Sequence, residues 1–140
     1  MGARRGTATV EFALVAPLIL LLTAAVLDYT LLLRTAISVA DAARAGALYG
    51  SLSAANASDT AGMQSAAAKA APDITGLTAT AARTCQCSDG SSVNCSGTCA
   101  SGPVRVYVQV TARATCSSIF SYAPVPFGGA VTSTASMRAQ

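Results

Sequence analysis

The chain of 140 residues has no histidine and no tryptophan, a single glutamate, a single lysine, and only 11% charged residues. Globular domains usually carry about 25% charged residues. An enzyme needs titratable side chains that converge on its substrate, and histidine is the one used most often for proton transfer. The sequence also lacks the G-x-S-x-G, P-loop and G-x-G-x-x-G motifs. We therefore predict that the protein is not an enzyme and binds no cofactor.

The shortage of basic residues argues against a nucleic-acid partner as well. The net charge is only +3, and the one lysine, Lys69, stands alone in an alanine-rich stretch. Domains that bind nucleic acid carry clusters of lysine and arginine on one face or along one helix. The chain has no such cluster with interleaved aromatic residues, so we predict no nucleic-acid binding.

A long apolar run near the N-terminus accounts for much of the low charge. From Val10 to Leu33 the only charged residues are Glu11 and Asp28, and about 20 mostly apolar residues suffice to span a bilayer. Arg4 and Arg5 precede the run. The positive-inside rule then predicts a single pass, with the N-terminus in the cytoplasm and the rest of the chain outside.

Two simpler interpretations of this run are a cleaved secretory signal peptide and a plain uncleaved anchor. A signal peptide has a small-residue cleavage site after its apolar core, and "TAAVLDY" (23–29) is similar to such a site. Neither interpretation accounts for Glu11, since a carboxylate in hydrocarbon is costly unless it is paired or neutralised. Neither accounts for the helical pattern that continues beyond the run.

That pattern predicts one long helix over residues 7–50, which spans the membrane in its first half. Four alanines of the second half recur at i, i+4, i+7 and i+11, the spacing of one helix face: Ala36, Ala40, Ala43 and Ala47. Pro17 is expected to kink or loosen the helix early. The first residues that favour a turn are Gly46 and Gly50.

Residues 51–140 are predicted to form a small domain outside the cytoplasm. The stretch 51–59 is small and polar and indicates a linker, and 59–72 predicts a short helix that Asp59 or Thr60 caps and Pro72 ends. Strands are predicted at 74–84, 104–115 and 130–138, with a Pro/Gly-rich connection at 122–129 before the last strand.

The clearest strand is 104–115, because apolar and polar residues alternate along it. Its apolar face comprises Val104, Val106, Val108, Val110 and Ala112, and its polar face Arg105, Tyr107, Gln109, Thr111 and Arg113. Such alternation is typical of an antiparallel sheet with one buried face, which the small-residue face of the long helix can cover. The predicted fold class is α+β: a long N-terminal helix packed against a small antiparallel sheet of about three strands, with one extra short helix.

Five cysteines carry further information, and four of them lie in the polar loop 85–99. Structural zinc usually takes a C-x2-4-C pair and often histidine, whereas this loop begins with C-x-C and the chain has no histidine. We therefore predict no metal and two disulfides, which persist outside the cytoplasm. Adjacent pairing of Cys85 with Cys87 is sterically poor, so each bonds to Cys95 or Cys99, in an order left open. Cys116, at the end of the long strand, is then a free thiol.

The N-terminal segment "RRGTATVEFALVAPLILLL" (4–22) resembles a class III prepilin, and more narrowly the TadE-like minor pilins, or pseudopilins, of tight-adherence (Flp, type IVc) pili. The glycine before the helix, the "EF" pair and the apolar helix that follows carry this resemblance. The tail "GAVTSTASMRAQ" is loosely similar, whereas the middle of the chain agrees only in its layout. The chain is longer than a major Flp pilin, which favours a minor subunit.

The resemblance implies that a prepilin peptidase cuts between Gly6 and Thr7, so residues 1–6 are a leader and Glu11 becomes position five of the mature chain. It also implies pilus assembly, adhesion and biofilm formation. The implied partners are other pilin and minor pilin subunits, an inner-membrane assembly platform, and membrane lipid before assembly. The protein would then lie first in the bacterial inner membrane and later in a pilus at the cell surface. A type II secretion pseudopilin and a membrane-anchored envelope or binding protein that never assembles are the alternatives.

Within this framework Glu11 is predicted to be an assembly contact. Cleavage would create a free α-amino group on Thr7, and the amine of a neighbouring subunit could pair with the Glu11 carboxylate. The alternative is that Glu11 lies at headgroup level near the cytoplasmic face.

Overall fold

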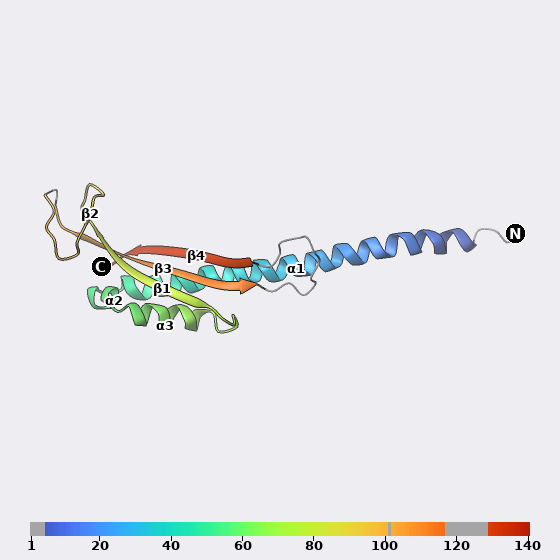
Figure 1. Cartoon of the computed structure of the whole chain (residues 1–140), viewed down its shortest axis with the longest axis horizontal. Coiled ribbons are helices and arrows are strands. Elements are labelled where there is room, and N and C mark those ends of the chain that lie inside the picture. Colours follow the sequence, from blue (N-terminus) through green and yellow to red (C-terminus); the bar gives the residue numbers. More distant parts are fainter. Residues whose placement is uncertain (1–4, 101, 117–128) are drawn as a thin grey trace.

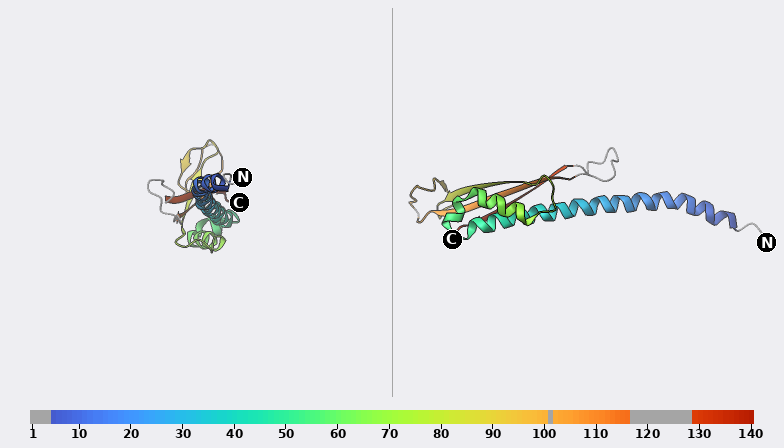
Figure 2. Two further views of the ribbon diagram at one scale, coloured as in Figure 1. Left: turned by 90° about the vertical axis from the view of Figure 1, so that its right-hand side faces the viewer. Right: turned by 90° about the horizontal axis from the view of Figure 1, so that it is seen from below.

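One continuous helix, α1 (Arg5–Ser51), forms the first third of the chain. The computed structural model describes residues 5–100, 102–116 and 129–140, with side chains from residue 8 onward. Between Leu18 and Ala45 the helix contains no glycine or proline, and its leucines and alanines are strong helix formers. Its 47 residues correspond to a rod about 70 Å long. The helix passes through Pro17 without interruption, and Figure 2 shows a smooth curve over its N-terminal half.

Two short helices follow α1. The predicted helix is α3 (Thr60–Ala70), and Asp59 caps it by accepting a hydrogen bond from the Gly62 amide at 2.8 Å. The stretch predicted as a linker contains a further helix, α2 (Ala54–Ser58), which that prediction missed. Ser53 caps α2 through its hydroxyl, which accepts from the Asn56 amide at 3.1 Å. Serine at an N-cap satisfies an otherwise free amide, so small polar residues are compatible with this single helical turn.

Four strands of the described residues form one antiparallel sheet in the order β2-β1-β3-β4. Its strands are β1 (Thr78–Gln86), β2 (Ser92–Val93), β3 (Arg105–Cys116) and β4 (Gly129–Arg138). The predicted fold class is confirmed, and the sheet gains β2, a two-residue strand within the cysteine-rich loop. The connection predicted at 122–129 lies outside the described residues, apart from Gly129, which begins β4.

The core lies between one face of the sheet and the second half of α1. The predicted alternation along β3 is present, with Val108, Val110, Ala112 and Ala114 fully buried or nearly so. Opposite them, α1 buries Val39, Ala42, Ala43 and Ala47, and α3 buries Met63 and Ala67. Of the predicted alanine face, Ala43 and Ala47 are buried, whereas Ala36 and Ala40 are half-buried at its margin.

Glycine allows these helices to approach closely. Gly46 and Gly50 do not end α1; both are buried inside it, against α3 and the sheet. A Cβ atom on Gly46 would lie 2.8 Å from the Met63 carbonyl oxygen and 3.0 Å from Val110 Cγ1. The two glycines therefore act as contact residues, not as turn residues.

The molecule has two layers and a long projection (Figures 1 and 2). The three helices lie on one face of the sheet, and no helix of the described residues covers the other face. The N-terminal half of α1 extends alone beyond the domain. At the opposite end the C-terminus returns to the end of α1, where the Gln140 amide donates to the Ser51 carbonyl at 3.1 Å.

Candidate functional site

The projecting part of α1, residues 8–33, is the candidate site, and we call it the apolar arm. Large apolar side chains are exposed along its whole length, and they include Val10, Phe12, Leu14, Leu18, Leu20, Leu22, Val26, Leu27 and Leu33. The most apolar 18-residue window of this helix is not buried at all within the protein. By length and composition α1 is able to cross a membrane. A soluble chain rarely exposes an apolar surface of this extent unless a membrane or a partner covers it.

Two threonine hydroxyls of the arm are satisfied within the helix itself. The Thr23 hydroxyl donates to the Leu20 carbonyl at 2.9 Å, and the Thr30 hydroxyl donates to the Val26 carbonyl at 2.8 Å. In hydrocarbon a polar group has no water to bond with and must find its partner inside the protein. These threonines are therefore compatible with a bilayer.

Glu11 differs from these threonines. Its side chain is exposed near the free end of the arm, and within the part of the chain with described side chains it forms no ion pair. Gly6 and Thr7 lie in the first turn of α1, so Thr7 and Glu11 are i and i+4 on one helix face. An unpaired carboxylate among exposed leucines and valines is unfavourable in a membrane. The geometry leaves Glu11 available to a group outside the described residues.

Asp28, the second acidic residue of the arm, has a different environment. It is only 5% exposed, although Leu27 and Tyr29 beside it are exposed, and the residue has an interaction partner. A buried, partnered carboxylate is not free for an intermolecular contact, so Glu11 remains the candidate.

The domain begins where α1 meets its neighbours. Arg34 of α1 lies 3.8 Å from the Asp73 carboxylate, which follows α3, and both side chains are exposed. Such an exposed pair contributes between zero and about 1 kcal/mol. Local sequence patterns do not predict this contact, because Arg34 and Asp73 are distant in the chain.

The far end of α1 is held by a small polar cluster. The Tyr49 hydroxyl donates to the Asp59 carboxylate at 2.9 Å, and the Asn56 side chain donates to the Tyr49 carbonyl at 3.1 Å. The hydrogen bond from the Gly62 amide, followed by that from Tyr49, lowers the pKa of Asp59. The hydrogen bond to Asp59 and its negative charge raise the pKa of Tyr49. This cluster joins α1, α2 and α3 and serves the fold.

The four bridged cysteines lie at the end of the sheet that points away from the apolar arm. The structure joins Cys85 to Cys95 and Cys87 to Cys99, which supplies the connectivity that the sequence left open. Cys116 is a free, half-buried thiol at the other end of β3. Cys85 is paired with Val106, ten positions before Cys116, a span of about 33 Å along a strand. Cys116 therefore cannot reach the loop.

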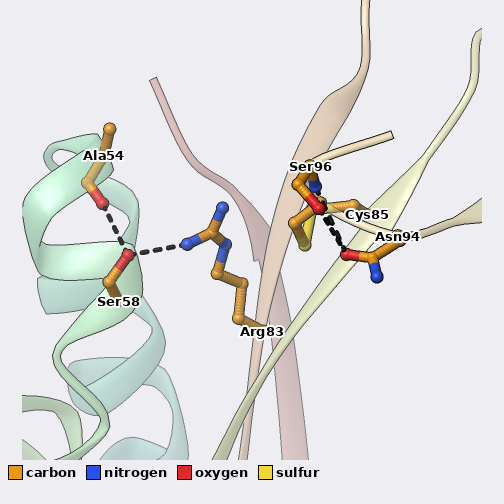
Figure 3. Close-up of a disulfide and its surroundings, with 7 residues drawn as sticks. Ala54, Ser58, Arg83, Cys85, Asn94 and Ser96 are labelled. Atoms are coloured by element: carbon orange, nitrogen blue, oxygen red, sulfur yellow. Dashed lines mark hydrogen bonds between the residues drawn. A yellow bond between two sulfur atoms is a disulfide. The ribbon is translucent and has the colours of Figure 1, made fainter. Parts of the chain in front are cut away.

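Further contacts fix the base of the disulfide loop (Figure 3). Arg83 extends from β1 toward α2, where its guanidinium donates to the Ser58 hydroxyl at 2.7 Å. Near Cys85, the Asn94 side chain accepts from both the amide and the hydroxyl of Ser96, at 3.3 and 3.1 Å. The loop is thus a closed, bonded unit attached to the end of the sheet. Among the described residues, no three His, Cys, Asp or Glu side chains gather in a way that could hold a metal ion.

Comparison with protein-family models gives a match to the N-terminal part of the chain. Residues 6–48, somewhat under a third of the chain, match the family model described as TadE-like protein. This family consists of pilus-associated structural subunits. The resemblance predicted from the sequence is therefore confirmed for the arm and the start of the packed half of α1. No curated protein and no solved structure gave a significant match.

Proposed function

We propose that the protein, which is TadE-like over residues 6–48, is a minor pilin or pseudopilin of a tight-adherence pilus. The observation that carries this proposal is the apolar arm: an exposed membrane-length helix, continuous with the core helix of a small domain, with one carboxylate near its end. A plain membrane anchor requires the apolar length of the arm but does not require the Glu11 carboxylate. A filament subunit would use the apolar length and the carboxylate.

In the proposed precursor the arm lies in the inner membrane. Arg4 and Arg5 hold the N-terminus on the cytoplasmic side, and the domain, residues 51–140, lies outside the cytoplasm. The two disulfides support this orientation, because disulfides persist in oxidising compartments. Lipid covers the arm until the subunit leaves the membrane.

Maturation is proposed to remove residues 1–6 by cleavage between Gly6 and Thr7. The cut would leave a new α-amino group one helical turn from Glu11. Within a single subunit this amine and the Glu11 carboxylate can pair at i and i+4, which lowers the cost of Glu11 before assembly.

In the assembled pilus the arms are proposed to pack against those of other pilin subunits. An inner-membrane platform is proposed to move each subunit out of the membrane, so that neighbouring subunits cover the arm in place of lipid. The Thr7 amine of a neighbour would then meet Glu11 only at one axial offset. A buried pair of this kind sets register more than it adds stability, because an unpaired partner costs about 3–5 kcal/mol. Attachment to surfaces and biofilm formation would follow from assembly into the pilus.

Processing distinguishes this proposal from a membrane-anchored protein that never assembles. We would express the full chain with and without a prepilin peptidase and measure the intact mass of each product. The proposal expects a product that begins at Thr7 only when the peptidase is present. Gly6→Leu should abolish the cut, whereas the matched change Gly2→Leu should leave it unaffected.

Two results would contradict the proposal. A product that begins after Ala24 or Ala25 would identify an ordinary secretory signal peptide. An unchanged mass in the presence of an active peptidase would identify a plain anchor.

A further inference from the structure

The face of the sheet that points away from the helices has a composition unlike the rest of the molecule. Residues directly opposite one another on antiparallel strands project on the same side, so the strand register defines this outer face. Its threonine and serine side chains are Thr78, Thr80, Thr84, Ser92, Thr111, Thr115, Thr132, Thr134 and Ser136. Its cations are Arg105, Arg113 and Arg138, and none of its positions carries an acidic residue.

The charges of this outer face are not neutralised. Both ion pairs found in the described part of the chain involve residues of the helical side, Arg34 with Asp73 and Arg44 with Asp41. Arg105, Arg113 and Arg138 take part in neither pair. Arg113 and Arg138 are exposed, and Arg105 is half-exposed.

The cations are spread over the face. Arg138 is paired with Tyr107, one strand over and two positions along from Arg105, which places their Cα atoms roughly 8 Å apart. Arg113 lies eight positions from Arg105 on the same strand, a distance of about 26 Å. A small anion can engage one end only, whereas an extended polymer with repeated negative charges can engage both.

Between the charged ends lies a polar surface. Thr111 and Thr134 share a hydrogen bond of 2.9 Å across strands, and the Thr80 hydroxyl donates to the Thr111 carbonyl at 3.4 Å. These contacts hold the side chains in fixed positions while leaving hydroxyl lone pairs free for a ligand. The half-exposed ring of Tyr107 lies beside Thr84 and Arg138.

We propose that this outer face binds an acidic polysaccharide. Arginine forms bidentate hydrogen bonds with carboxylates, ordered hydroxyls suit the hydroxyls of sugars, and the Tyr107 ring offers one apolar surface to a sugar ring. The proposal goes beyond assembly, and it relies on the proposed function only in placing the face outside the cell.

A nucleic acid is the other extended polyanion to consider, and the face suits it less. Proteins that bind single strands combine a basic groove with several aromatic side chains on which successive bases stack. Among the described strand positions the outer face has one aromatic residue, Tyr107, and its side chains mainly carry hydroxyl groups. The chemistry therefore favours a glycan with carboxylate groups.

Binding can be measured on the full chain in detergent. Alginate, a polymer of uronic acids, is the probe; neutral dextran and single-stranded poly-dT are the comparison ligands. We expect alginate to bind, dextran not to bind, and poly-dT to bind more weakly than alginate. Addition of salt should weaken alginate binding because the contacts are exposed and charged.

A pair of double variants tests the location. The double variant Arg105→Gln with Arg138→Gln should weaken alginate binding by about tenfold or more. Each of its two substitutions removes the charge-assisted hydrogen bonds that the arginine would make with a carboxylate. The matched control, Arg44→Gln with Lys69→Gln, removes the same charge from the helical side and should change binding by less than about twofold, since those side chains belong to helices on the opposite face of the sheet. Tyr107→Leu should weaken binding without any change in charge.

Three results would overturn the proposal: no alginate binding by the unaltered chain, equal losses in both double variants, or tighter binding of poly-dT. Circular dichroism of every variant confirms that the domain is folded. The two proposals fail separately, because Arg105→Gln with Arg138→Gln should leave cleavage at Gly6 intact, whereas Gly6→Leu should leave alginate binding intact.

Discussion

Gly46 of α1 lies directly against the backbone of Met63 in α3, so closely that a Cβ atom on Gly46 would be 2.8 Å from the Met63 carbonyl oxygen. Met63 is itself fully buried and is the largest such side chain in a core otherwise made of valine and alanine. The distance between the two helices is therefore set by the absence of a side chain at position 46.

The first prediction concerns this contact. Gly46→Ala should destabilise the domain by about 1–3 kcal/mol, because the new methyl group would meet backbone that cannot move aside as a side chain can. The gain in helix propensity, about 1 kcal/mol, offsets only part of that cost. Thermal unfolding of the full chain in detergent measures the effect.

Gly129→Ala is the matched control, since a Cβ atom there would meet nothing within 4 Å. It should leave the unfolding temperature close to that of the unaltered chain. Equal stability of the two variants would contradict close packing at Gly46.

A second prediction follows from Asp59. Its pKa in the folded protein is lower than the ordinary value of 3.8, so the unfolded state binds protons more readily. The stabilising contribution is therefore complete above about pH 4 and is lost as the pH falls through the folded pKa. Asp59→Asn keeps a capping side chain but removes this titration, so its unfolding temperature should fall less steeply in acid. If the unfolding temperatures of the two proteins fell equally steeply with falling pH, the lowered pKa of Asp59 would be refuted.

The third prediction concerns the thiols. Alkylation of unreduced protein from the cell envelope should label Cys116 at most, because the other four cysteines are bridged. Removing either bridge with paired serine substitutions, at Cys85 and Cys95 or at Cys87 and Cys99, should cost about 3 kcal/mol on the chain-entropy estimate. Cys116→Ser is the control and should leave both bridges closed by intact-mass analysis. Free labelling of all five cysteines would contradict the disulfides.

The fourth prediction concerns Glu11. Glu11→Ala should leave membrane insertion and the cut after Gly6 intact but reduce incorporation into pili to background, because the proposed intermolecular pair is lost. Immunoblots of sheared pili and cross-linking to partner pilins measure this.

Thr23→Val is the control on the same arm, since the Thr23 hydroxyl bonds only to its own helix. It should assemble normally. Normal piliation by Glu11→Ala, with unchanged cross-links, would indicate that Glu11 lies merely at headgroup level.

The sequence predicted the elements whose signals are local. Alternation along β3 and the apolar length of α1 identified a buried strand face and a membrane-length helix, and both are present. Contacts between distant residues were not predictable in this way. Gly46 favours a turn when it is considered alone, and only the position of Met63 explains why it lies inside a helix. Serine and asparagine in 51–59 suggested a linker, whereas capping by Ser53 makes a helical turn.

The candidate site was predictable for a similar reason. Glu11 is conspicuous in the sequence because its neighbours are apolar, and no three-dimensional information is needed to notice it. The proximity of Arg105 and Arg138 could not be predicted in this way, because only the pairing of β4 with β3 brings these two residues near each other. A strand order with another neighbour beside β3 would have separated them.

Because α1 is one uninterrupted helix that begins in the arm and ends in the core, it connects the two mechanically. From Glu11 to Val39 the axial length is about 42 Å, and a pull on one end displaces the other by the same amount. Each residue by which the arm shifts lifts the entire sheet by about 1.5 Å. In the proposed membrane-embedded precursor, the height of the sheet above the membrane would therefore follow the depth of Glu11.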